Sequence, residues 1–176
     1  MFLLECNEKF LINSISSLLI QKNIFHTLEK EKKFFFILEI IVSQNEIELR
    51  GPSKIIKLKT PTTINLLVKE VFNLFSDFTL EIKGAKFYPL KQSIVYKNQE
   101  TYLGNIQFTI FSQLVLNIEE GLNKIDLYKD IWPSDKEFQF NKLDTHLTNL
   151  KNHLKDKINY DFIFSTRSGL IYISVD

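Results

Sequence analysis

The stretch from Leu127 to Leu154, LYKDIWPSDKEFQFNKLDTHLTNLKNHL, decides the fold of the C-terminal half of this chain. It reads as a short helix that ends at Ile131-Trp132, a polar loop, and then a second, amphipathic helix. Apolar residues recur in this second helix at steps of four, three and four, which places them on one helical face. These residues are Leu143, Leu147, Leu150 and Leu154.

The opposite face of the second helix carries amides and hydroxyls, with almost no carboxylate among them. A helix that buries leucines and presents such groups outward is what a helix-turn-helix needs to enter the major groove of DNA. The alternative is an ordinary surface helix, which periodicity alone favours. The residues of this outer face are Asn141, Thr145, Thr148, Asn149 and Asn152.

Size and composition allow one domain or two small ones, because the chain has 176 residues, of which 44% are apolar. No apolar run approaches the ~20 residues of a membrane helix, so no membrane partner is expected. The start of the chain lacks a basic leader and does not read as a secretory signal. Cys6, the one cysteine, excludes an internal disulfide and a multi-thiolate zinc site and fits a reducing cytosol. We therefore expect a cytoplasmic protein.

The N-terminal half alternates strands and helices. Residues 2–5 and 24–28 are predicted as strands on either side of a helix over 8–22, and the run FFFILEIIV at 34–42 is predicted as a buried parallel strand. After a polar turn, residues 54–59 alternate as a strand. Thr60-Pro61 is then predicted as the cap and first position of a helix that runs to about Phe75. The pattern indicates a small α/β unit with a parallel sheet.

The pattern changes near Ser76-Asp77. Residues 78–104 alternate apolar and polar side chains, with turn signals at Lys83-Gly84 and Lys97-Asn98, as in an antiparallel meander. Helices are predicted over 105–117, 124–132 and 141–155, followed by a closing hairpin over 160–175 that turns at Thr166 to Gly169. The fold class is therefore α+β: an α/β unit over residues 1–76, then a winged helix over residues 77–176.

Residues 78–176 resemble the effector domain of OmpR/PhoB-type response regulators. The matching segments are Leu103 to Phe108 with Ile110-Phe111 and Leu114 in the first helix, Leu127 to Trp132 in the second, and Leu143 to Leu147 with Leu150 and Leu154 in the recognition helix. Gly169 falls at the wing. The resemblance implies a winged helix-turn-helix that binds double-stranded DNA.

The chain also departs from that family. Thr148 and Asn149 stand where the family usually has arginines, with Lys151 a turn later, and the wing has Thr166, Arg167 and Ser168. Residues 77–176 hold 12 lysines and arginines against 13 aspartates and glutamates, a balance of −1. Because phosphate neutralisation supplies most non-specific DNA affinity, one such domain should bind weakly unless its charge is segregated.

The first 76 residues resemble a receiver domain with its middle removed. Cys6 and Asn7 fall near the family's acidic, metal-binding pair, so the magnesium site looks lost. Glu39 falls near the phosphoacceptor aspartate at the end of the third strand, where it could mimic a phosphoaspartate but not be phosphorylated in the ordinary way. Lys59 to Pro61 is similar to the lysine-proline corner before the last helix. The resemblance thus implies a degenerate receiver in a protein of two-component ancestry.

The function that follows is a sequence-specific transcriptional regulator that acts independently of phosphorylation. The expected partners are double-stranded DNA, a second copy of the chain through residues 54–59 and 61–75 of the N-terminal domain, and RNA polymerase; nucleoid association would follow from DNA binding. The alternative is a winged helix that has lost DNA binding and recognises a protein. The candidate DNA-binding residues are Lys142, Thr145, His146, Thr148, Asn149, Lys151, Asn152, Lys155 and Arg167.

Other chemistry finds little support in the sequence. His146 and His153 lie seven residues apart on one side of the helix, but no third ligand has suitable spacing for a metal. Glu119 and Glu120 are adjacent and so do not face each other as an acid–base pair. No phosphate-binding glycine loop or nucleophile elbow is present in the sequence. We therefore expect neither an enzyme nor a cofactor, and we expect Trp132 to be a core residue.

Overall fold

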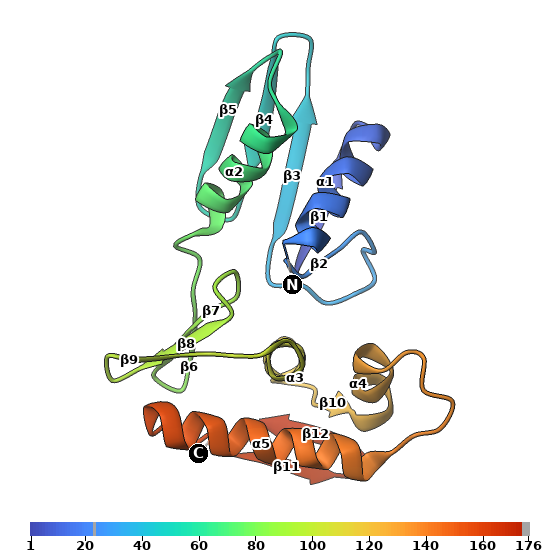
Figure 1. The fold of residues 1–176 in the computed structure, drawn as a ribbon, viewed down its shortest axis with the longest axis vertical. Helices are drawn as coiled ribbons and strands as arrows, with labels where there is room; N and C mark the ends of the chain where they lie inside the picture. The colour runs from blue at the N-terminus through green and yellow to red at the C-terminus, as the bar shows by residue number, and fades with distance from the viewer. Residues whose placement is uncertain (23, 174–176) are drawn as a thin grey trace. The chain divides into compact units, whose positions relative to one another are not determined.

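The computed structural model describes residues 1–22 and 24–173 and divides the chain into two compact units, Met1–Phe78 and Thr79–Asp176, called unit 1 and unit 2 below. The division falls two residues after the predicted boundary at 76. Both units combine helices with β-sheet, so the α+β class is confirmed (Figure 1).

Unit 1 is built on a five-stranded mixed sheet with the order β2-β1-β3-β4-β5. Strand β1 is parallel to β2 and β3, whereas β3, β4 and β5 are successively antiparallel. The expectation of a parallel sheet was therefore wrong for two of the four strand pairs. The strands are β1 Phe2–Cys6, β2 His26–Thr27, β3 Ile37–Val42, β4 Glu46–Arg50 and β5 Ile55–Lys59.

Strand β4 lies where the sequence analysis placed only a polar turn. The turn itself is residues 43–45, and the Ser43 hydroxyl donates to the Glu46 carbonyl at 3.0 Å, which reverses the chain at once. Ile47 and Leu49 are buried while Glu48 and Arg50 point to the other face. This is the alternation of a strand with one solvated face, and it was hidden by the charged residues within it.

Two helices cover one face of this sheet. Helix α1 (Lys9–Gln21) and helix α2 (Ile64–Phe75) contact each other as well as the sheet, and the buried layer between them and the strands includes Leu38 and Ile40. The side chain of Thr63 accepts the hydrogen bond of the Leu66 N–H and caps α2. The predicted cap at Thr60-Pro61 was wrong, because the helix begins three residues after Pro61.

The other face of the sheet carries an ion-pair network. Arg50 pairs with Glu39 on β3 (Nη1 to Oε2, 3.1 Å) and with Glu48 on its own strand. Lys57 on β5 lies 3.2 Å from carboxylate oxygens of both Glu46 and Glu48. Opposite charges thus alternate across three neighbouring strands, which allows this face to stand in water without a helical layer.

Unit 2 begins with the predicted meander, a four-stranded antiparallel sheet of β6 Leu80–Ile82, β7 Ala85–Tyr88, β8 Ser93–Tyr96 and β9 Gln99–Tyr102. Two of its hairpins turn at Lys83-Gly84 and Lys97-Asn98, and all four of these residues have positive φ. Paired positive φ angles at two-residue loops match the right-handed strand twist, as in type I′ turns. Both turn signals in the sequence were therefore read correctly.

The remainder of unit 2 contains the three predicted helices, α3 Asn105–Leu116, α4 Lys124–Ile131 and α5 Phe140–Ile158. A three-stranded sheet follows the order β10-β12-β11, with β10 Leu122–Asn123, β11 Phe164–Arg167 and β12 Leu170–Ile173. The short β10 was not predicted. It joins the C-terminal hairpin to the start of α4, which completes the winged-helix arrangement. Residues 174 and 175 of the predicted hairpin lie outside the described residues.

Candidate nucleic-acid interface

Helix α5 is held in unit 2 by the leucine row that the sequence predicted. Leu143, Leu147, Leu150 and Leu154 are each at most 1% exposed, and Ile158 extends the row by one more turn. The helix ends at Ile158 and is followed by Asn159, which adopts the left-handed conformation (φ 52°) that closes many helices. The burial of one complete face fixes which residues α5 presents to solvent.

The threonines of the outer face have their hydroxyl protons engaged within the helix. Thr145 donates to the Asn141 carbonyl at 2.8 Å, and Thr148 donates to the Asp144 carbonyl at 2.9 Å. Each hydroxyl keeps its lone pairs and its neighbouring methyl group for outside contacts. These two residues are therefore prepared to accept a hydrogen bond or to contact an apolar group such as the thymine methyl.

Asn149 and Asn152 are exposed about one turn apart on the outer side of α5, and Lys151 is exposed on a flank of the helix. In the part of the chain that the structure describes, no ion pair or hydrogen bond of these three side chains is found. Each amide offers a donor and an acceptor together, which is the combination that pairs with an adenine edge. The amides and Lys151 are thus the candidate residues best placed to reach a ligand.

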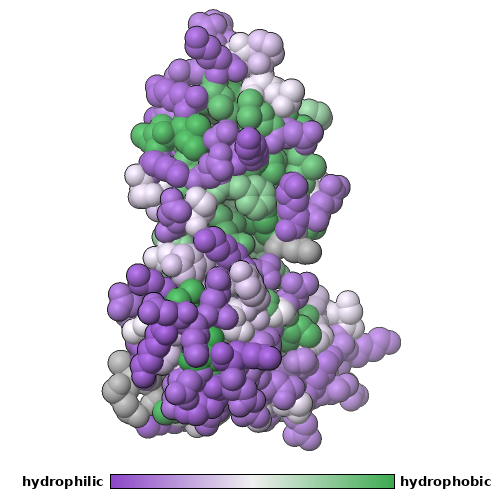
Figure 2. All heavy atoms as spheres, turned by 60° about the vertical axis from the view of Figure 1, so that its left-hand side comes forward, coloured by the Kyte–Doolittle hydropathy of each residue, from purple (hydrophilic) through white to green (hydrophobic). Residues whose placement is uncertain are grey.

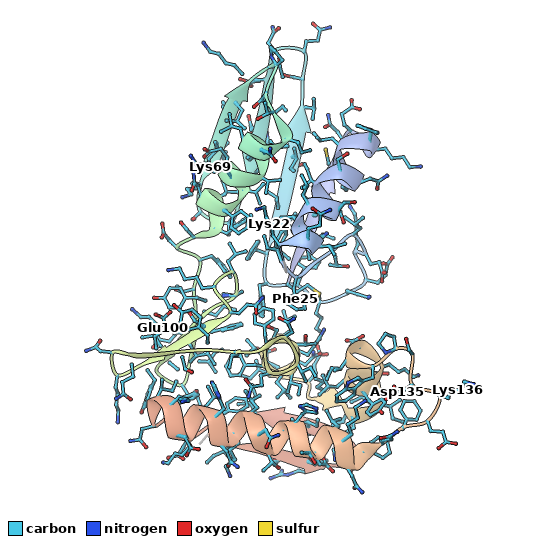
Figure 3. The ribbon with its side chains drawn as sticks, in the orientation of Figure 1. Lys22, Phe25, Lys69, Glu100, Asp135 and Lys136 are labelled. Carbon is cyan, nitrogen blue, oxygen red and sulfur yellow. The ribbon has the colours of Figure 1, made fainter. Side chains whose placement is uncertain are left out.

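Lys142 is tied to the loop that precedes α5. Its Nζ lies 3.0 Å from Asp135 Oδ2 and 4.1 Å from the centre of the Trp132 ring. The Tyr128 hydroxyl also donates to Asp135 Oδ2, at 2.6 Å, and these two hydrogen bonds hold the pKa of Asp135 below its usual value. Asp135 is labelled in the loop between α4 and α5 in Figure 3. This four-residue cluster anchors the first turn of α5 and neutralises Lys142.

Trp132 belongs to that cluster and not to the core. It is half-buried, and its ring lies 4.8 Å from Tyr128 and 5.3 Å from His146, centre to centre. The expectation of a core tryptophan was wrong because the chain leaves the helix at this residue. His146 is correspondingly a packing partner of Trp132 at the edge of the exposed face.

Two further lysines are paired with carboxylates. Lys155 Nζ lies 2.7 Å from Asp161 Oδ2, and Lys124 Nζ lies 2.6 Å from Asp144 Oδ1 on α5. These ion pairs are at the surface, where screening makes them weak and easily exchanged. Of the candidate lysines on α5, Lys142 and Lys155 are therefore partly neutralised, whereas Lys151 is exposed and has no ion pair within the described residues.

The two histidines of α5 point to different neighbours. His153 Nε2 lies 2.9 Å from the Thr101 hydroxyl on β9, whereas His146 packs on Trp132. Over residues 1–22 and 24–173, no three His, Cys, Asp or Glu side chains gather in a group that could hold a metal ion. Over the same residues, no helix is long and apolar enough to cross a membrane.

The hairpin of β11 and β12 supplies the wing. It turns through Ser168 (φ 51°) and Gly169 (φ 79°), a two-residue loop with both φ angles positive. Arg167, the last residue of β11, is exposed beside this turn together with Thr166. Strand β12 of the wing also pairs with β10, which directly precedes α4. The sheet that contains the wing is therefore connected to the start of the helix-turn-helix.

Glu39, the predicted pseudo-phosphoacceptor, lies within β3 in unit 1. It pairs in register with Glu5 and Arg50, and its carboxylate meets the Arg50 guanidinium. Glu39 stands in mid-strand, since β3 continues to Val42, as the strand predicted over 34–42 implied. There the Asn7 side chain both donates to the Val42 carbonyl (2.9 Å) and accepts from its N–H (2.8 Å), a role that sequence reasoning missed.

Comparisons with known proteins give structural neighbours only. No family model matches the sequence, and no curated protein matches it. The DNA-binding domain of CpxR from E. coli is similar over 55% of this chain and 96% of its own length, at 20% identity and a TM-score of 0.46. DrrB, a Thermotoga maritima OmpR/PhoB homolog, is similar over 99% of this chain and 98% of its own, at 10% identity and a TM-score of 0.48.

A third structure comes from streptococcal redox sensors described as having evolved from two-component response regulators. It is similar over 98% of this chain and 66% of its own length, at 12% identity and a TM-score of 0.45. The solved structures that resemble this chain thus include response regulators of the OmpR/PhoB type, at low identity.

Proposed function

We propose that this protein is a DNA-binding transcriptional regulator that inserts helix α5 into the major groove. The observation that carries the proposal is the division of α5 into a fully buried leucine row and an exposed row of uncharged hydrogen-bonding side chains. A recognition helix needs both a rigid seat on its domain and polar groups free to meet base edges. The five side chains of this row carry no carboxylate, which phosphates would repel, although the exposed Asp144 and Asp156 of α5 lie next to them.

The candidate residues divide into two roles. Asn149 and Asn152 are proposed to contact base edges, and Thr145 and Thr148 to accept a hydrogen bond or contact a thymine methyl. Lys151 and Arg167 are proposed to contact phosphates on either side, with Arg167 reaching flanking backbone or minor groove from the wing. Lys142 and Lys155 can join them only by exchanging Asp135 and Asp161 for phosphate.

A dimer would offset the weak charge of a single winged helix. Strand β5 is an edge strand of its sheet, and Ile55 on it is 59% exposed; Leu66 on the adjoining helix α2 is 42% exposed. Figure 2 shows apolar residues on this side of unit 1, whereas the visible face of unit 2 is mainly hydrophilic. We propose that two copies associate through β5 and α2, so that each reads one half-site.

RNA polymerase is the further partner expected of such a regulator. Phe138 and Phe140, at the junction of the α4–α5 loop and α5, are 45% and 41% exposed. Exposed aromatic side chains beside a proposed DNA-contacting helix offer a surface that a second protein could bury.

We propose further that DNA binding is independent of phosphorylation. Glu39 stands in mid-strand with its carboxylate paired to Arg50, so it is neither an acceptor in the ordinary sense nor free to signal. Incubation with acetyl phosphate should leave both the mass of the protein and its DNA affinity unchanged. Glu39→Gln should also leave DNA affinity unchanged. A mass gain of one phosphoryl group, together with altered DNA affinity, would contradict this part of the proposal.

The deciding experiment is selection of genomic fragments by the full-length protein at about 50 mM and 200 mM salt. Enrichment of a shared sequence at low salt, weakened steeply at high salt, is expected because released counterions drive phosphate binding. The variant Asn149→Ala/Asn152→Ala should lose the shared sequence while retaining non-specific binding. No enrichment at low salt would overturn the DNA-binding proposal.

A second candidate function is protein recognition by the same winged helix. It is favoured by the ion pairs that neutralise Lys124, Lys142 and Lys155 with Asp144, Asp135 and Asp161, respectively. Phosphates would have to displace these carboxylates, whereas a protein surface of mixed charge would not. Two results together would support this alternative. The fragment selection would fail, and a pull-down would retain a protein partner with the wild-type chain but not with the Asn149→Ala/Asn152→Ala variant.

A further inference from the structure

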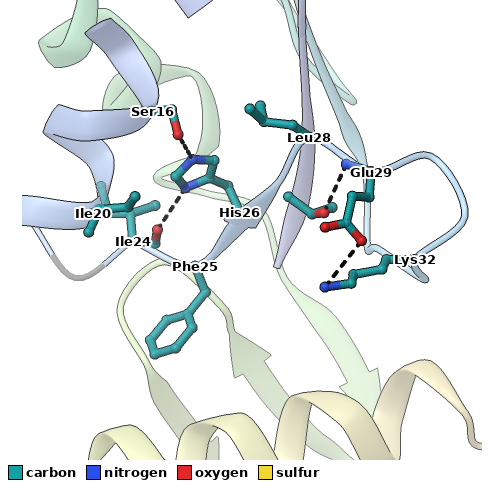
Figure 4. A pocket seen from close by; sticks show the side chains of 9 residues that line it. Ser16, Ile20, Ile24, Phe25, His26, Leu28, Glu29 and Lys32 are labelled. Atoms are coloured by element: carbon teal, nitrogen blue, oxygen red, sulfur yellow. Dashed lines mark hydrogen bonds and ion pairs between the residues drawn. The ribbon is translucent and has the colours of Figure 1, made fainter. Parts of the chain in front are cut away.

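Unit 1 contains a surface cavity of about 490 Å³ beside strand β2, on the exposed edge of the five-stranded sheet. Its walls are formed by the C-terminal half of α1, by β2 and by the residues that follow β2. Figure 4 shows Ser16 and His26 at its centre, Ile20 and Ile24 on one side and Leu28 on the other. The cavity is therefore mainly apolar with one polar pair at its centre.

The hydrogen bonds of His26 fix which atoms of this pair donate. His26 Nδ1 lies 3.0 Å from the Ile24 carbonyl oxygen, which can only accept, so Nδ1 carries the proton. Burial lowers the pKa of His26, and neutral His26 therefore has an unprotonated Nε2. Nε2 lies 2.7 Å from Ser16 Oγ and must accept the hydroxyl proton. Ser16 consequently presents only its oxygen lone pairs to the cavity.

The other serines of α1 show that this arrangement is particular to Ser16. Ser14 donates to the Phe10 carbonyl at 3.1 Å, and Ser17 donates to the Asn13 carbonyl at 2.9 Å, the usual bond of a helical serine. Ser16 instead turns toward His26 on the next strand. The pair thus forms an acceptor that is oriented before any ligand arrives.

Charge at the cavity rim is balanced. Glu29 and Lys32 both line the cavity and pair with each other, with Oε2 and Nζ 3.3 Å apart. Ile20 and Leu28 at the wall are 64% and 46% exposed, so their burial by a ligand would be favourable. A charged ligand would meet no net opposite charge here, whereas an uncharged apolar one would gain from the walls.

We infer that this cavity binds an uncharged, mainly apolar small molecule that carries one hydroxyl or N–H donor, of the phenol or aromatic alcohol class, with the donor on Ser16 Oγ. Its volume lies within the ~300–1,000 Å³ of small-molecule sites. A peptide added as an extra strand is disfavoured, because β2 has only two residues to pair with it. The site is formed by residues of unit 1, and the inference does not depend on the proposed DNA binding by unit 2.

The test compares 4-methylphenol with 4-methylanisole, which has the same apolar body but lacks the donor, by titration calorimetry on the full chain. Wild-type protein should bind 4-methylphenol about five- to tenfold more tightly than 4-methylanisole, the factor expected of one hydrogen bond. Ser16→Ala should remove this preference by weakening the phenol alone. Ser17→Ala, the matched control on the same helix, should leave it unchanged.

A second pair of variants tests the apolar wall without touching the hydrogen bonds. Ile20→Lys should weaken both probes by tenfold or more, whereas Phe10→Lys, at a more exposed apolar site of α1 outside the cavity, should weaken neither. Both positions are exposed, so these variants should fold. Three results would each overturn the inference. They are equal affinity of the wild-type protein for the two probes, unchanged affinity of Ile20→Lys for both probes, and no binding of either probe at millimolar concentration.

Discussion

The side chain of Lys142 lies 3.0 Å from the carboxylate of Asp135, so a lysine in the first turn of helix α5 is neutralised by the loop that precedes it. Asp135 also accepts the Tyr128 hydroxyl, which ties the carboxylate to helix α4. The charge that α5 offers to a phosphate is therefore set partly by a residue outside the helix.

Asp135→Asn should increase DNA affinity at low salt and make it more salt-dependent. Releasing Lys142 adds one phosphate contact, which steepens the slope of log affinity against log salt by about 0.9. Fluorescence anisotropy over a series of salt concentrations measures this slope. Glu81→Gln, the same change of charge on strand β6, is the control; an equal steepening there would assign the effect to net charge alone.

Asn149→Ala and Lys151→Ala should affect DNA binding in different ways. The asparagine variant should lose about 1–3 kcal/mol of discrimination at one base pair, because a base-edge contact carries sequence information. The lysine variant should weaken all sequences alike and reduce the salt slope by about one. Competition between the selected sequence and random DNA separates the two results, and uniform weakening by Asn149→Ala would refute its role.

Leu150→Ala should destabilise unit 2 by about 2–5 kcal/mol, the usual cost of a cavity at a fully buried leucine. Trp132, the single tryptophan of the chain, lies in unit 2 and reports its unfolding by fluorescence in urea. Ile163→Ala, at a position 43% exposed, should cost far less. If the two variants had similar urea midpoints of unfolding, the leucine row would not be what holds α5 in unit 2.

The stability of unit 1 should fall as the pH decreases below about 6.5, the ordinary pKa of histidine. Burial lowers the pKa of His26 in the folded state; the Ile24 hydrogen bond opposes this and the Met1 amino group adds to it. The unfolded chain thus binds a proton at a higher pH than the folded one, so acidification favours unfolding until the folded pKa is reached. His26→Gln should flatten only the part of this fall that lies below about pH 6.5. The part that comes from the buried Met1 amino group, whose pKa is lowered to about 5, should remain.

Circular dichroism in urea at pH 7.5 and 5.5 measures the effect, since unit 1 contains neither tyrosine nor tryptophan. His146→Gln, which alters unit 2 only, is the matched control and should retain the wild-type change of unit 1 with pH. A pH response of His26→Gln equal to that of the wild type would show that another group controls it.

Local patterns predicted the fold where the signal lay within one element. The leucine spacing of α5 and the turns at Lys83-Gly84 and Lys97-Asn98 were read correctly, because helical period and turn chemistry are short-range. Strand β4 was missed because its outer face is charged, and its charges make sense only beside Glu39 and Lys57 on the neighbouring strands. This strand is stabilised by ion pairs with neighbouring strands, which the periodicity of a single segment does not reveal.

The candidate site shows the same division. The sequence identified the residues of α5 that reach solvent, but not their partners. Asp135 and Asp161 lie several residues from the lysines they pair with, outside the helix, and nothing in their spacing marks the ion pairs. The Ser16–His26 pair was also missed, since it joins a helix to a strand ten residues later.

The charged outer face of unit 1 also affects how molecules of this protein meet one another. A bare apolar sheet would stack on a second copy, and a long bare edge would recruit another strand. Stacking here would strip water from Glu39, Glu48, Arg50 and Lys57, at a desolvation cost that their mutual attraction would not recover. A sheet covered by helices on only one side is thereby protected from face-to-face stacking, which leaves the edge at β5 and α2 as the surface for the proposed association of two copies.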